Sequence, residues 1–187
     1  MVESLAKFIG AGLQAGDPCI VVATPAHITA LEAALRKKNI DVSGATDGGS
    51  YRLLDAQACL SDISVDGLPD KTRFDRFMDT LLAETAREGK VTRVFGEMVA
   101  LLWANENQAA AILLEGLWND LVGARPITLF CAYPMHYFAN LGQENLLQQI
   151  GQLHSSLVMP RRANALRTRL DKDTYKAAFR KSPLPGS

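Results

Sequence analysis

The sequence lacks the cysteine pattern of a disulfide framework or a zinc site. Its three cysteines, Cys19, Cys59 and Cys131, are an odd number, and no two of them have CxxC spacing. Each lies in or beside an apolar segment, where a free cysteine behaves as a small hydrophobic residue. We therefore expect unpaired thiols in a reducing compartment, the cytoplasm.

Long apolar runs are missing as well. No stretch approaches the ~20 apolar residues that a membrane-spanning helix needs. Residues 1–4 include the acidic Glu3, and no apolar signal-peptide core follows them. We expect neither a membrane span nor a secretory signal.

The motifs of several enzyme classes are also absent. The sequence contains no GxxxxGK[ST] phosphate-binding loop, no GxSxG elbow and no HExxH zinc motif. The glycines of residues 10–16 precede the first predicted strand and have no Lys-Ser/Thr after them, so they fit neither a P-loop nor a dinucleotide fingerprint. No cluster of His and Asp residues suggests a metal site, and no nucleophile–base pair is evident. We expect no catalytic residue, no metal and no cofactor.

The residues that are present suit one folded domain. The chain of 187 residues is 48% hydrophobic and 21% charged, a composition that excludes disorder. Residues 160–187 hold 8 of the 20 basic and 2 of the 20 acidic side chains, so this tail is net +6 and the body is net −6. An acidic body makes nucleic-acid binding unfavourable. For the tail we expect a solvated basic helix or linker, and contact with an acidic partner or nucleic acid is the alternative.

Strand-like and helix-like segments alternate along the chain. Continuous apolar runs, typical of strands buried on both faces, predict strands at residues 18–24, 51–54, 91–95 and 126–132. Helical spacing of apolar side chains predicts helices at residues 27–39, 74–89, 98–104, 107–121 and 141–157. Residues 44–50 read as a glycine-rich turn. The pattern predicts an α/β fold with a mainly parallel central sheet flanked by helices.

Polar side chains follow these predicted strands, where open parallel sheets bind ligands. They are Thr24 and His27 after the first strand, Asp55 after the second, Glu97 after the third, and Tyr133 and His136 after the fourth. Because the carboxyl ends of parallel strands meet at one edge, we expect these side chains to converge on a ligand site.

The same residues have structural alternatives. Glu97 could instead cap the helix that begins beside it, since a carboxylate there is favoured by free N–H groups and by the helix dipole. Trp103 and Trp118 lie among leucines at helical spacing and could belong to the core. An aromatic-lined pocket would place Trp103, and less readily Trp118, in its wall. His27 and His136 could be polar surface groups.

Several segments of the chain resemble one known family. They occur in the family's order over about residues 5–159 and read FIGAGLQAGDPCIVVATPAH, GGSYRLLDAQACL, GLPDKTRF, FGEMVALLW, LEGLWNDL and LFCAYP. Together they resemble the MEDS domain, the sensory domain named for methanogens, methylotrophs and the DcmR regulator. The most specific segments are FGEMVALLW and LLEGLWNDL. The resemblance implies a sensory domain at residues 1–159, followed by the tail at 160–187.

The resemblance carries further implications for fold and partners. It implies a three-layer sandwich related to RecA/KaiC-type ATPases, but without the phosphate-binding loop that precedes the segment matching residues 18–24. In those ATPases a strand-end acid falls near Glu97, and Asp55 occupies a similar inherited place. Such domains occur alone or joined to histidine kinases and transcription regulators, and are thought to sense small organic molecules in the cytoplasm.

Three functions follow from these observations. The first is a non-catalytic sensor that binds a small organic molecule and relays the binding signal to a signalling or transcriptional partner. The second is a degenerate ATPase-like hydrolase with Glu97 as general base and Asp55 on a metal. The third is a protein-interaction module without ligand. The basic tail, predicted as a helix with Leu166, Leu170 and Ala177 on one side, could also pair with the acidic body of a second copy in a homodimer.

Overall fold

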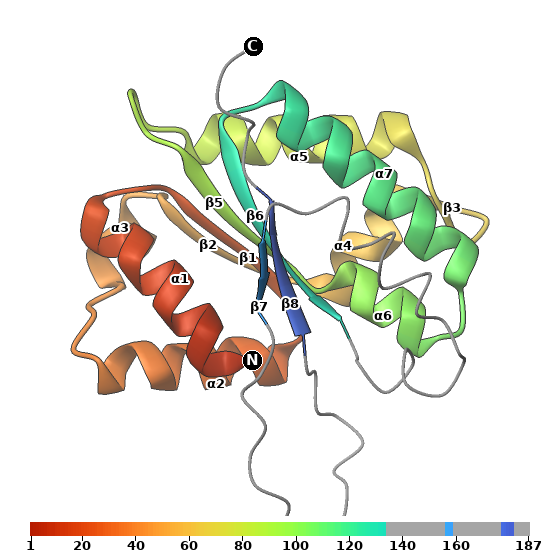
Figure 1. Cartoon of the computed structure of the whole chain (residues 1–187). Helices are drawn as coiled ribbons and strands as arrows, with labels where there is room; N and C mark the ends of the chain where they lie inside the picture. The colour runs from red at the N-terminus through yellow and green to blue at the C-terminus, as the bar shows by residue number, and fades with distance from the viewer. Residues whose placement is uncertain (134–155, 159–176, 182–187) are drawn as a thin grey trace, which may run out of the picture.

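A six-stranded sheet forms the centre of the protein, in the strand order β2-β1-β5-β6-β8-β7 (Figure 1). The computed structural model describes residues 1–133, 156–158 and 177–181. Four strands pair in parallel: β2 (Tyr51–Asp55), β1 (Cys19–Ala23), β5 (Thr92–Gly96) and β6 (Ile127–Tyr133). The strands β8 (Ala177–Lys181) and β7 (Ser156–Val158) continue the sheet antiparallel. This arrangement confirms the predicted α/β fold with a mainly parallel sheet.

Helices cover both faces of the sheet and complete a three-layer sandwich (Figure 1). One face carries α1 (Val2–Ala15), α2 (Pro25–Lys37) and the short α3 (Ser43–Asp47). The other face carries α4 (Ala56–Ile63), α5 (Lys71–Thr85), α6 (Met98–Ala104) and α7 (Gln108–Ala124). A small hairpin, β3 (Ser64–Val65) with β4 (Leu68–Pro69), joins α4 to α5.

Strand β1 shows why its sequence is apolar throughout. Cys19, Val21 and Ala23 face α1 and α2, whereas Ile20 and Val22 face the layer of α4 to α7. All five side chains are fully buried. Because successive residues of a strand point to opposite faces, burial on both faces requires a continuous apolar run. Each buried aliphatic side chain contributes about 1.5–3 kcal/mol, so β1 holds the two helical layers together.

Arg93 joins α1 to the sheet at the amino ends of the strands. Its Nε donates to Asp17 Oδ2 at 3.0 Å, and its Nη1 donates to the carbonyl of Phe8 at 3.2 Å. The guanidinium also lies 5.4 Å from the centre of the Phe8 ring. Gly12 leaves the space that the Arg93 side chain occupies: a Cβ atom at Gly12 would lie 2.5 Å from Arg93 Cδ.

The four predicted strands and the predicted helices up to residue 121 agree with the observed ones to within a few residues, but several observed elements were not predicted, among them the β3–β4 hairpin. Helix α1 was not predicted, although Leu5, Phe8 and Ile9 form its buried face. Helix α4 was not predicted either; it begins at Asp55, whose Oδ1 accepts from the Ala58 N–H at 2.8 Å. Part of the predicted glycine-rich turn is the short helix α3.

Two helix predictions near the C-terminus are wrong where the structure describes them. Ser156 and Leu157, the predicted end of a helix at 141–157, lie in β7. Ala177, assigned to the helix of the basic tail, lies in β8 and pairs with Tyr133. The pairing of β8 with β6, and of β7 with β8, supplies backbone hydrogen bonds that helical spacing along the chain does not reveal. The other residues of both predicted helices lie outside the described part, and the division of the chain after residue 159 stays a prediction.

No helix in the described part of the chain is both long and apolar enough to cross a bilayer.

Two helical glycines give a matched test of this packing. Gly12→Ala should lower the free energy of unfolding by about 1–3 kcal/mol, because the new methyl group overlaps Arg93 and the Cys19 sulfur. Gly116→Ala in α7 meets no atom within 4 Å and should raise it by about 0.5–1 kcal/mol. Chemical denaturation of both variants measures the difference. Equal effects would contradict this packing of α1.

The buried thiols give a second test. Burial raises the pKa of the Cys19 thiol to about 12 and that of Cys59 to about 11. Since the thiolate is the reactive form, the folded protein should react slowly with a disulfide reagent near pH ~8, and the denatured protein quickly. Both pKa values exceed the ordinary 9.0, so the free energy of unfolding should fall as the pH rises from 9.0 toward 11. Rapid labelling of the folded chain would contradict the burial.

Candidate functional site

The carboxyl ends of β1 and β5 lie side by side and bring three of the predicted site residues together. In the parallel pairing, Val22 is opposite Gly96, and the Glu97 N–H donates to the Val22 carbonyl at 2.9 Å. Thr24 follows β1 and is the N-cap of α2, whose first turn carries His27. Glu97 follows β5 and directly precedes α6. The chain therefore leaves both strands with a polar side chain at the same edge.

Glu97 is fully buried and links these two strand ends. Its Oε2 accepts from the backbone N–H of Thr24 at 2.7 Å. Its Oε1 lies 2.6 Å from His27 Nδ1, and Thr24 Oγ1 lies 3.0 Å from the same ring nitrogen. The His27 side chain is 19% exposed, so this strand-edge cluster of Thr24, His27 and Glu97 reaches the surface through the imidazole.

The hydrogen bonds of the cluster define what Glu97 can do. A carboxylate can only accept, so Nδ1–H of His27 donates to Oε1, and Thr24 Oγ1 is close enough to share that proton. A buried carboxylate is tolerated when it is paired and hydrogen-bonded, and both oxygens of Glu97 have protein donors. Glu97 occupies the N-cap position of α6, but its side chain makes no cap hydrogen bond. The capping alternative is therefore wrong, and the carboxylate serves as a cross-link between β5, β1 and α2.

The other predicted site residues are placed differently. Asp55 caps α4 through the Ala58 N–H, and no hydrogen bond or ion pair among the described residues joins it to Glu97. Trp103 is 3% exposed and belongs to the core beneath the sheet. Tyr133 is the last residue of β6, and His136 lies outside the described residues. A ligand role for these residues stays a prediction.

Trp118 belongs to the hydrophobic core, as the structural alternative predicted. It is fully buried and meets Phe74 edge to face, with ring centres 5.1 Å apart. A Cβ atom at Gly96 would lie 3.5 Å from the indole, at ordinary contact distance, so Trp118 packs directly beneath the end of β5. The indole therefore supports the strand end that positions Glu97, from within the core.

The chain matches the model of one protein family. The model of the MEDS domain, described as the methanogen/methylotroph, DcmR sensory domain, matches residues 1–154. The chain belongs to the MEDS family. The match includes the strand-edge cluster and every element from α1 to β6, so the chain carries a sensory-type domain. No curated protein and no solved structure matches the chain significantly.

Sequence reasoning about this MEDS domain missed a second group of polar side chains. Three arginines, Arg52, Arg73 and Arg76, surround a pocket between β2 and α5. A signal was present in β2, where Arg52 interrupts the apolar residues that precede Asp55. Within the described residues, no group of three or more His, Cys, Asp or Glu side chains is placed to hold a metal ion.

Two glutamates give a matched test of the cross-link in this MEDS domain. Glu97→Gln places an amide against the Thr24 N–H and the His27 Nδ1–H, so one buried donor loses its acceptor or His27 must change tautomer. The free energy of unfolding should fall by about 1–3 kcal/mol. Glu3→Gln makes the same chemical change at the exposed Lys38 pair, 2.8 Å long, and should have a smaller effect. Chemical denaturation measures both; an equal loss in the two variants would contradict the cross-link.

Proposed function

We propose that this MEDS domain is a non-catalytic sensor that binds a small, partly apolar organic molecule at the carboxyl edge of the parallel strands. Binding is relayed to a signalling or transcriptional partner, such as a histidine kinase or a transcription regulator. The family supports the sensory role. The observation that carries the proposed site is the buried Glu97 carboxylate held against Thr24 and His27 at the strand edge.

The burial of Glu97 argues against its use as a general base. A general base must lie within hydrogen-bond reach of the proton that it removes. Both oxygens of Glu97 face protein donors, and the side chain is fully buried. The carboxylate is thus suited to orient His27, whose partly exposed imidazole supplies a polar contact to a ligand.

The position of the cluster also supports a relay. Thr24 and His27 belong to the start of α2 on one face of the sheet, whereas Glu97 begins α6 on the other. A ligand can shift an equilibrium only by binding one arrangement better than another. A molecule that contacts the cluster would therefore favour one relative position of these two helices, and a partner on either helical layer could respond.

The alternative functions make different demands. A hydrolase with Glu97 as general base and Asp55 on a metal must bind a nucleotide with its metal ion. A ligand-free interaction module binds no small molecule. Neither has a specific contact that favours it, so the same experiment distinguishes all three.

A thermal-shift screen of the full chain against small organic acids, alcohols and amines, and against Mg²⁺ with ATP, tests the proposal. An organic ligand at ~100 times its Kd should stabilise the fold by about 2.7 kcal/mol. Magnesium-ATP should give no shift. The Kd of each hit is then measured by calorimetry in Glu97→Gln and His27→Gln, and both substitutions should weaken binding of a ligand held at the strand edge.

Asp17→Asn is the matched control. Asp17 also joins β1 to β5 through Arg93, but at the opposite edge of the sheet. This substitution should lower stability and leave the Kd unchanged. A shift by magnesium-ATP that depends on Glu97 would overturn the sensor in favour of the hydrolase. If no compound shifts the melting temperature, the result favours the interaction module over the sensor.

A further inference from the structure

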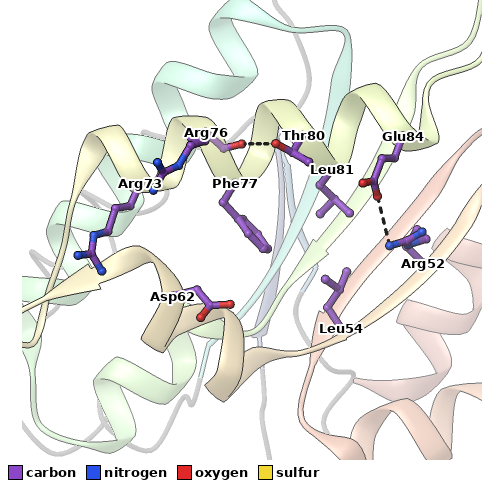
Figure 2. A pocket seen from close by; sticks show the side chains of 9 residues that line it. All are labelled: Arg52, Leu54, Asp62, Arg73, Arg76, Phe77, Thr80, Leu81 and Glu84. Atoms are coloured by element: carbon purple, nitrogen blue, oxygen red, sulfur yellow. Dashed lines mark hydrogen bonds and ion pairs between the residues drawn. The ribbon is translucent and has the colours of Figure 1, made fainter.

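A pocket of about 390 Å³ lies between the edge strand β2, the end of α4 and one side of α5 (Figure 2). Its volume falls within the range of about 300–1,000 Å³ typical of small-molecule sites. None of its lining residues belongs to the strand-edge cluster. The pocket is therefore a separate feature of the fold.

The strand period creates the pocket. Along β2, Tyr51 and Leu53 pack under α1 and α2, so Arg52 and Leu54 point to the opposite face. Strand β2 is at the edge of the sheet, and α5 passes beside it. Phe77 and Leu81 point from α5 toward Leu54 (Figure 2), which gives the pocket an apolar floor.

The rim of the pocket is charged, and its two ends differ. At one end Arg52 is paired with Glu84 at 3.2 Å. At the other end Arg73 and Arg76, one helical turn apart on α5, stand opposite the single carboxylate of Asp62 (Figure 2). Positive charge therefore exceeds negative charge at this second end.

The two arginines at this end are suited to different tasks. Arg73 Nη1 donates to the Ser64 carbonyl at 3.2 Å, which orients its guanidinium. The guanidinium of Arg76 makes no hydrogen bond or ion pair within the described residues. A guanidinium is a planar, permanent donor that matches a carboxylate in two parallel hydrogen bonds. The N–H groups of Arg76 can therefore donate hydrogen bonds to an anion at the mouth of an apolar pocket.

We propose that this pocket is a second ligand site, which binds a small organic acid. The carboxylate of the ligand pairs with Arg76, beside the oriented Arg73, and its flat or branched apolar body lies on Phe77, Leu54 and Leu81. Inorganic anions would use the arginines but not the apolar floor, and cations would meet the arginines unfavourably. The proposal does not depend on the strand-edge cluster, and the two sites can be tested separately.

Titration of the ¹⁵N-labelled full chain with benzoate tests the proposal. Saturable shifts are expected at the amide signals of β2 and α5. Acetate and inorganic phosphate should bind at least about tenfold more weakly, because they leave the apolar floor uncovered. Benzylamine, which has the same ring with a positive charge, should not saturate. Phosphate binding as tight as benzoate, or saturation by benzylamine, would overturn the proposal.

Three variants locate the binding. Arg76→Gln should weaken benzoate about tenfold, which corresponds to the loss of one charge-assisted hydrogen-bonded pair. Arg36→Gln is the matched control: Arg36 is an exposed arginine of α2 on the opposite helical layer, and benzoate affinity should stay within about twofold. Glu97→Gln should also leave benzoate binding unchanged. Equal loss in Arg76→Gln and Arg36→Gln, or loss only in Glu97→Gln, would refute the pocket as the benzoate site.

Discussion

The burial of β1 on both faces is the constraint on which the rest of the structure depends. All five of its side chains are inaccessible, so helices must cover the sheet on each side, and neither face of this strand is available to a ligand. Polar side chains that could contact a ligand lie in two places: at the ends of the strands and at the free edge of the sheet. The strand-edge cluster occupies the first place, and the arginine-rimmed pocket beside β2 occupies the second.

In the proposed sensor, the strand-edge cluster has a structural role and a binding role in the same atoms. Burying a charged carboxylate without partners costs several kcal/mol, so Glu97 is retained only together with its donors on Thr24 and His27. The same burial keeps the carboxylate out of reach of a substrate proton. This is the physical reason for preferring a sensor to a hydrolase, although the acid lies where an α/β fold commonly places catalytic groups.

Helix α4 relates the two proposed sites geometrically. It starts at Asp55, at the carboxyl edge of β2, and reaches the pocket through Asp62. A ligand in the pocket would therefore contact an element whose first turn lies at the sheet edge. A sensory domain with two ligand sites could in this way combine two signals, provided that each ligand distinguishes between two arrangements of the helices.

The local pattern of the sequence determined the layers of this protein, but not which polar groups meet. Apolar runs and helical spacing predicted all four parallel strands and most helices, because burial on two faces or on one face leaves a periodic trace along the chain. The position of Glu97 at a strand end followed from the same pattern. Only the tertiary structure placed β5 beside β1, which brings the Glu97 carboxylate to the Thr24 N–H, 73 residues away in the chain. It also decided that Asp55 caps a helix, and that Arg52 and Arg76 share a pocket. Periodicity records how much of each residue is buried, whereas partners depend on strand order and helix placement, which no local pattern specifies.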